Sequence, residues 1–127
     1  MGYYNNDTRR NMTRTFIQTN EFSNNWDRLG FDDEDLRWLE NEIMKDPKKY
    51  PVIKGTGSLR KARIAMNNRG KSKSARVCYV DFLIAETVYL ITVYGKNEKD
   101  NLSMQERHEI KRMIEALERN LGGKQDE

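Results

Sequence analysis

Two strand-like segments joined by a short link constrain the fold of this chain more than any other feature. The segment 75–83, ARVCYVDFL, is apolar on both of its faces, and the segment 86–94, ETVYLITVY, is rich in β-branched and aromatic residues. This composition is typical of β-strands. The short link suits a hairpin, so we expect the two strands to be antiparallel neighbours. The first of them, apolar on both faces, is predicted to lie in the centre of a sheet.

The preceding segment, 59–65, has the alternation of a strand with one buried face. In LRKARIA, the apolar residues Ala62 and Ile64 are two positions apart, and the basic residues Lys61 and Arg63 alternate with them. Successive side chains of a strand point to opposite faces. We therefore predict that Ala62 and Ile64 face the core, and that Lys61 and Arg63 point together to the other face.

Apolar residues recur at helical spacing in three further segments. The segment 20–30 is closed by Gly30, and the segment 32–47 opens with the acidic run DDED and is stopped by Pro47. Acidic residues are favoured in the first turn of a helix, which is why we interpret this run as helix capping and not as a metal site. The last helix is predicted to begin at Ser103, because Ser103 and Glu106 form the S-x-x-E pattern of a capping box.

Together with a candidate first strand at 14–19, RTFIQT, these segments give the order β-α-α-β-β-β-α. The predicted fold class is α+β, with a small antiparallel β-sheet packed against helices on one face and its other face relatively open. We expect a disordered or extended N-terminal segment over 1–14, a single domain over 15–122 and a flexible C-terminal tail over 123–127.

Composition indicates a single soluble domain in the cytoplasm. The chain has 127 residues, of which 36% are hydrophobic and 34% are charged, and this length allows one modest core. No apolar run approaches the length of a membrane span, and the N-terminal residues are too polar for a secretory leader. Cys78 is the only cysteine, so it forms no internal disulfide, which favours a cytosolic location.

Positive charge is concentrated in one part of the chain. The net charge is only +3, but the segment 47–80 contains 10 basic residues and no acidic residue, whereas 21–46 contains 9 acidic and 3 basic residues. Such a block of one sign indicates a polyanionic partner. The alternative is a solvated surface on which the bias has no function.

Several kinds of chemistry find no support. Gly70-Lys71-Ser72 matches the end of a nucleotide-binding loop, but Ala65 stands where its first glycine is required, and a strand follows instead of a helix. His108 is the only histidine, which excludes a two-histidine ribonuclease. Cys78 lies in the middle of a strand, where a buried thiol is expected. No cysteine or histidine cluster has zinc-binding spacing, so neither a metal nor a cofactor is predicted.

The remaining polar residues suit RNA. Arginine and lysine neutralise phosphates, and tyrosine rings stack on unpaired bases. RNA cleavage through the 2′-hydroxyl needs a base, an acid and charge stabilisation at phosphorus, which lysine and arginine are able to supply. The candidate cations are Lys61, Arg63, Arg69, Lys71, Lys73, Arg76 and Lys96, interleaved with Tyr79, Tyr89 and Tyr94. The hairpin tip that carries Arg69, Lys71 and Lys73 is predicted to touch the RNA backbone.

Two segments, GTGSLRKARIAMNNRGKSKSARVCYV and VYLITVYGKNEKDNLS, are followed by a capped final helix. In this order they resemble the RelE/HigB family of toxins from type II toxin–antitoxin systems, over about residues 15–120. The resemblance implies a RelE-like fold and a metal-independent endoribonuclease that cleaves mRNA at the ribosome and inhibits translation. It also implies a cognate antitoxin, encoded by an adjacent gene and carrying a helix-turn-helix, that silences the toxin.

The resemblance also implies where the active site lies. The alternating basic residues of the family's strand fall on Lys61 and Arg63, the arginine of the next strand falls on Arg76, and the last strand ends at Tyr94 and Lys96. We expect Arg63 and Arg76 to bind phosphate in the transition state, Lys61 or Lys96 to transfer protons and Tyr94 to stack on or orient a base. The assignment of the acid and the base stays open.

Two other functions are compatible with the same residues. A non-catalytic RNA- or ribosome-binding module would bind with similar dependence on salt but would cut no message. An interaction domain would use its basic face to dock an acidic protein.

Overall fold

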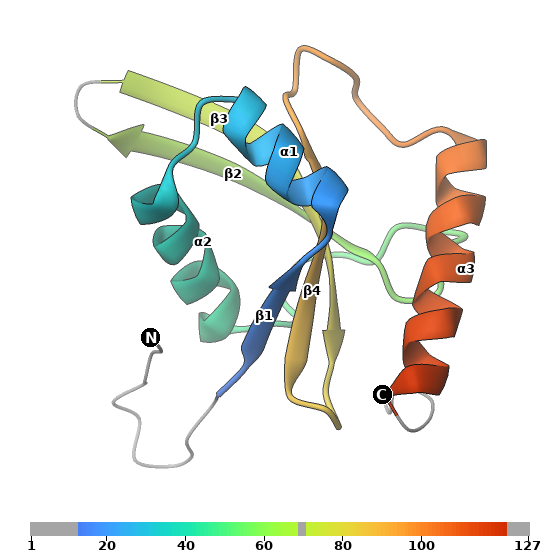
Figure 1. Cartoon of the computed structure of the whole chain (residues 1–127). Helices are drawn as coiled ribbons and strands as arrows, with labels where there is room; N and C mark the ends of the chain where they lie inside the picture. The colour runs from blue at the N-terminus through green and yellow to red at the C-terminus, as the bar shows by residue number, and fades with distance from the viewer. Residues whose placement is uncertain (1–12, 69–70, 122–127) are drawn as a thin grey trace.

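The computed structural model of the chain describes residues 13–68 and 71–121. In this part of the chain the elements follow the predicted order, and the α+β class is confirmed (Figure 1). The elements are β1 (Thr15–Gln18), α1 (Asn20–Arg28), α2 (Asp33–Lys45), β2 (Arg60–Asn68), β3 (Lys71–Phe82), β4 (Thr87–Tyr94) and α3 (Met104–Asn120).

The strands form one sheet in the order β1-β4-β3-β2. β3 pairs antiparallel with both β2 and β4, as the short links predict. β1, however, runs parallel to β4, so the sheet is mixed and not wholly antiparallel. The chain reaches β2 from β1 only through two helices, so no hairpin sets the direction of β1.

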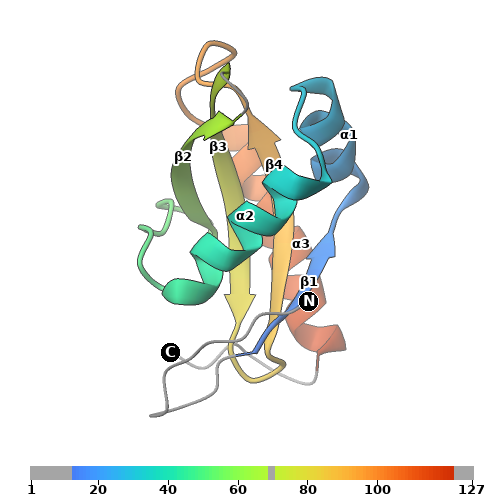
Figure 2. The same ribbon diagram turned by 90° about the vertical axis from the view of Figure 1, so that its left-hand side faces the viewer.

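Helices cover both faces of the sheet, which corrects the expectation of helices on one face. α1 and α2 pack Phe22, Trp26, Leu39 and Ile43 onto one face, called here the α1/α2 face. Ile110 and Ile114 of α3 pack against the opposite face, called here the α3 face. Figures 1 and 2 show α2 and α3 on opposite sides of the sheet.

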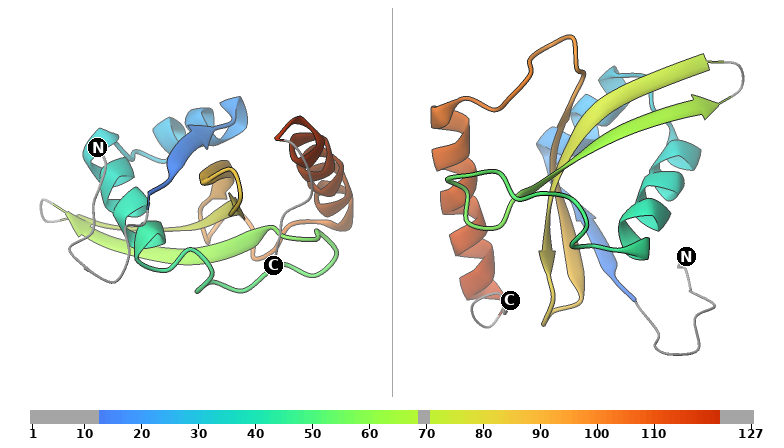
Figure 3. Two further views of the ribbon diagram at one scale, coloured as in Figure 1. Left: turned by 90° about the horizontal axis from the view of Figure 1, so that it is seen from below. Right: turned by 180° about the vertical axis from the view of Figure 1, so that it is seen from behind.

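β3 explains why both faces need cover. Its side chains alternate between the two hydrophobic clusters, with Val77 and Tyr79 in the α1/α2 cluster and Cys78 and Val80 in the α3 cluster. A central strand that is apolar on both faces is stable only when both are buried. The long β2–β3 hairpin curves away from α3 (Figure 3), so part of the α3 face of these strands has no helix over it.

The helix ends follow the predicted signals. Ser103 Oγ accepts the Glu106 backbone N–H at 3.1 Å, and Glu106 Oε1 accepts the Ser103 N–H at 2.8 Å, which confirms the capping box of α3. α1 ends at Arg28 with Leu29 as its C-cap, and Gly30 follows with a φ of +88°, which is easily adopted only by glycine. Among the described residues, no helix has the length and apolar character needed to cross a lipid bilayer.

An ion pair ties the chain just before β1 to the end of β3, an inner strand of the sheet. Arg14 Nε donates to Asp81 Oδ1 at 2.7 Å and Arg14 Nη2 to Oδ2 at 3.2 Å, with the two side chains only 7% and 2% exposed. Arg14 therefore packs with the domain. Residues 1–12 and 122–127 lie outside the described residues, and the expectations for both ends of the chain stay predictions.

Removing Arg14 is expected to destabilise the fold strongly. Arg14→Ala leaves Asp81 as a buried charge without its partner, which typically costs about 3–5 kcal/mol. Urea unfolding followed by circular dichroism measures the change. Arg28→Ala is the control, because it removes the pair with Glu98, whose side chains are 51% and 37% exposed, and such surface pairs contribute little. Equal losses in the two variants would contradict the prediction.

Candidate active site

The strand register brings three predicted site residues into one row. Arg63 of β2 lies opposite Arg76 of β3, and Arg76 lies opposite Tyr94 of β4. Directly opposed side chains on neighbouring strands share a face. Ala62 and Ile64 are buried in the α1/α2 cluster, as predicted. The row of Arg63, Arg76 and Tyr94, called here the cross-strand row, therefore lies on the α3 face. Arg63 is exposed there.

A second row runs beside the first. Lys61 lies opposite Cys78, and Cys78 lies opposite Thr92. At one side, Lys61 Nζ donates to Asn101 Oδ1 at 3.1 Å. At the other, Thr92 Oγ1 donates to Glu21 Oε2 at 2.6 Å. A buried thiol is thus flanked by a cation and a carboxylate.

The electrostatic surroundings of Cys78 and Tyr94 show that these side chains converge. Burial raises the pKa of Cys78 to about 12, and the positive charges of Lys61 and Lys99 oppose the shift. Burial also raises the pKa of Tyr94 to about 12; a Cys78 thiolate would raise it further, while Arg76 and Arg63 act to lower it. Both groups are therefore protonated at neutral pH. This leaves Cys78 without the thiolate that a nucleophile needs.

Two buried polar atoms of the first row lack a hydrogen-bond partner among the described residues. They are Arg76 Nε and Tyr94 Oη. An unsatisfied buried donor costs roughly 1–3 kcal/mol, so such groups call for an explanation. A guanidinium N–H and a phenol O–H are both donors to phosphate oxygen. The row therefore has the donor chemistry of an anion site.

Sequence reasoning missed two charged residues beside the row. Lys99, in the loop after β4, holds its Nζ 5.1 Å from the centroid of the Tyr94 ring. The same Nζ donates to Glu106 Oε2 at 2.6 Å. The sequence analysis treated Glu106 only as a helix cap. The sequence did carry a signal for Glu106. The capping box of Ser103 and Glu106 follows β4 closely, so the Glu106 carboxylate is expected near the end of that strand.

Lys73 and Tyr79 are not brought to the row. Lys73 follows the alternation of Ala75 and Val77 and so lies on the α1/α2 face, where Nζ donates to the Gly30 carbonyl and lies 3.5 Å from Asp35 Oδ2. Tyr79 is fully buried on the same face, which prevents it from stacking on a base. Both residues serve the framework.

Three other predicted site residues are not placed in either row, and the predicted roles of all the site residues stay predictions. Lys96 is exposed in the turn after β4 and lies outside the cross-strand row. Arg69 and the side chain of Lys71 lie outside what the structure describes. Tyr89, the remaining tyrosine, packs edge-on against Phe82 with ring centroids 5.7 Å apart.

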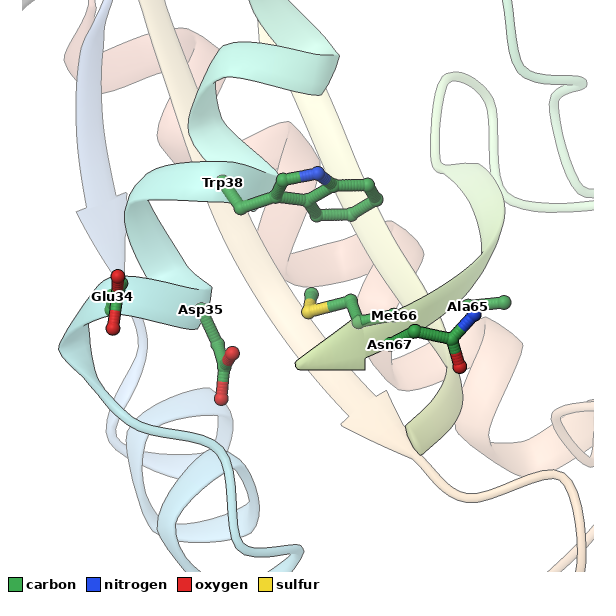
Figure 4. A pocket seen from close by; sticks show the side chains of 6 residues that line it. All are labelled: Glu34, Asp35, Trp38, Ala65, Met66 and Asn67. Carbon is green, nitrogen blue, oxygen red and sulfur yellow. The ribbon is translucent and has the colours of Figure 1, made fainter. Parts of the chain in front are cut away.

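A cavity of about 240 Å³ lies between α2 and β2 (Figure 4). It is lined by Glu34, Asp35, Trp38, Ala65, Met66 and Asn67. None of these residues belongs to the predicted site. Within the described ranges, the structure contains no cluster of three or more histidine, cysteine or acidic side chains arranged to hold a metal ion.

Comparison with known proteins shows the fold. No protein-family model matches the chain. The solved structure of a double mutant of the E. coli toxin RelE, in the free state, matches with a TM-score of 0.51. The match has 17% sequence identity and covers 70% of this chain and 90% of that chain. The chain therefore has a RelE-like fold, which confirms the resemblance at the level of structure.

Removing the Tyr94 hydroxyl is expected to leave stability unchanged. Tyr94→Phe breaks no hydrogen bond and removes a buried polar group, so the free energy of unfolding should stay within about 0.5 kcal/mol of the parent or rise. Tyr79→Phe is the matched control. It removes the 2.6 Å hydrogen bond from Tyr79 Oη to the Pro47 carbonyl and should cost about 1–3 kcal/mol. A loss in Tyr94→Phe as large as in Tyr79→Phe would show that Oη has a partner.

Proposed function

We propose that this protein is the toxin of a type II toxin–antitoxin module, a metal-independent endoribonuclease that cleaves mRNA at the ribosome and inhibits translation. The observation that carries the proposal is the pair of neighbouring buried donors, Arg76 Nε and Tyr94 Oη, both without a partner among the described residues. They lie in a row with Arg63 on a RelE-like sheet. The scissile phosphate of RNA would supply the acceptor oxygens.

The roles follow from the reaction. The 2′-oxygen of the RNA attacks phosphorus while the bond from phosphorus to the 5′-oxygen breaks, which gives a 2′,3′-cyclic phosphate and a 5′-hydroxyl. Arg76 and Arg63 stabilise the negative charge that grows on the phosphoryl oxygens. Lys61, in the adjoining row, is our first candidate to move a proton between the two reacting oxygens and the solvent, and Lys96 is the second.

Burial changes the role assigned to Tyr94. Its side chain is only 3% exposed, and Lys99 lies over its ring, so little of the ring is left for a base to stack on. Its pKa of about 12 keeps the phenol neutral. We therefore assign Tyr94 as a hydrogen-bond donor to a phosphate oxygen, which its enclosed Oη reaches once the side chains over it shift on RNA binding. Arg69 and Lys71 stay proposed contacts with the RNA backbone. Lys73 is not proposed as one, because its ammonium group contacts Gly30 and Asp35 on the α1/α2 face.

The proposal includes the partner and the location. A toxin of this kind acts in the cytoplasm and is silenced by an antitoxin. We expect a short reading frame beside this one to encode a helix-turn-helix protein. Co-expression of that protein should restore growth to cells that express the chain.

Arg76→Ala is expected to abolish toxicity. Expression of the parent should arrest growth and cut translated mRNA at discrete positions, which primer extension maps. Loss of a transition-state donor lowers the cleavage rate by roughly 10²–10³-fold. Arg37→Ala, which removes an exposed arginine of α2, is the control and should behave as the parent does.

Two outcomes contradict this picture. If Arg76→Ala arrests growth as strongly as the parent, the site is wrong. If the parent binds ribosomes but leaves the message intact, the chain is a non-catalytic binding module.

A further inference from the structure

The loop between β4 and α3 is held in place along its length. Near its start, the Gly95 N–H donates to Glu98 Oε1 at 2.9 Å, and Arg28 of α1 pairs with the same carboxylate. Further on, Asn101 accepts the hydrogen bond from Lys61, and Leu102 is buried in the α3 cluster. The backbone that carries Lys99 is therefore fixed relative to the sheet.

The Lys99 side chain is fixed as well, by a carboxylate with two functions. Glu106 Oε1 accepts the Ser103 N–H of the capping box, and Glu106 Oε2 accepts from Lys99 Nζ. The hydrogen bond from Lys99 is the main cause that lowers the pKa of Glu106, and the one from the Ser103 N–H is the second. Glu106 is therefore ionised at neutral pH. It binds the ammonium group over the ring of Tyr94, the residue that lies opposite Arg76 in the strand register.

We propose that Lys99 is a catalytic residue that donates to a phosphoryl oxygen of the substrate RNA together with Arg76, and that Glu106 is the positioning residue that aims it. This inference rests on the proposed function, which it extends by one cation. The Lys99 side chain is 36% exposed, so its ammonium group is accessible to a ligand while it keeps its contact with Glu106. A donor that is already oriented needs no reorganisation when charge develops in the transition state.

Stability alone does not explain the pair. An ion pair exposed to this extent contributes little to folding, because water screens it. Lys96, three positions earlier, is nearer to Tyr94 in sequence but is exposed in the turn. Lys99 is the cation of this loop that the fold directs to Tyr94. Lys99, and not Lys96, is therefore the lysine that this loop adds to the cross-strand row.

The test compares single-turnover cleavage of mRNA on programmed ribosomes for the parent and variants. Lys99→Ala should lower the rate constant by about 10²-fold, and Lys99→Arg should recover part of the loss. Glu106→Gln retains the capping box, because glutamine serves at that position, but it removes the charge. It should lower the rate by roughly three- to ten-fold in the parent and have no further effect in Lys99→Ala, since coupled residues are not additive. Lys111→Ala, an exposed site on α3, is the control and should cleave at the parental rate.

Binding gives a readout that a structural role would not change. With ribosomes programmed by 2′-O-methylated mRNA, which lacks the attacking hydroxyl, Lys99→Ala should reduce the salt dependence of log K by about 0.7, the value for one phosphate contact on a single strand. Lys111→Ala should leave that slope unchanged.

The outcomes separate the two proposals. A parent that neither binds nor cleaves overturns the proposed function and this inference with it. A parent that cleaves, with Lys99→Ala matching Lys111→Ala in rate and slope, overturns the inference alone.

Discussion

The register between β3 and β4 is the constraint on which the candidate site depends. The pairing shifts by one residue between Cys78 and Tyr79, so that Tyr79 lies opposite Leu90 but Cys78 lies opposite Thr92. Without this bulge the pairing of Leu90 would continue in step and set Val93, not Tyr94, opposite Arg76. Because side chains alternate with a period of two, Tyr94 would then point to the α1/α2 face. A single extra residue thus places the phenol beside the guanidinium, which is a known use of bulges.

The site is rigid because its floor belongs to the core. Tyr94 and Cys78 are members of the α3 cluster, with Ile110 and Ile114 packed on the same cluster from α3. Leaving two buried donors unsatisfied costs less free energy than burying the apolar side chains of this cluster provides. The fold therefore tolerates both donors in the cross-strand row. The helix that completes this cluster also supplies Glu106. The packing of α3 therefore also holds in place the carboxylate that orients Lys99.

Local sequence patterns predicted those features of the site that strand alternation and helix capping determine. Alternation in β2 set Lys61 and Arg63 on one face, and the capping box fixed the start of α3. The same alternation counted back from Arg76 would have shown that Lys73, three residues away, points to the other face. The bulge that directs Tyr94 and the loop that carries Lys99 depend on long-range pairing and packing, for which one sequence holds no signal. The parallel direction of β1 and the face chosen by α3 were hidden for the same reason.

The basic segment is divided by the fold into two roles. Arg60 donates to the carbonyls of Lys48 and Tyr50 at 3.0 and 2.6 Å, and Lys73 contacts Asp35 at the start of α2, so these cations fix the framework. Lys61, Arg63 and Arg76 gather on the α3 face instead. The acidic residues of α2 lie on the opposite side of the sheet from these three cations. Under the proposed function, this separation favours the approach of RNA to the cross-strand row over its approach to α2.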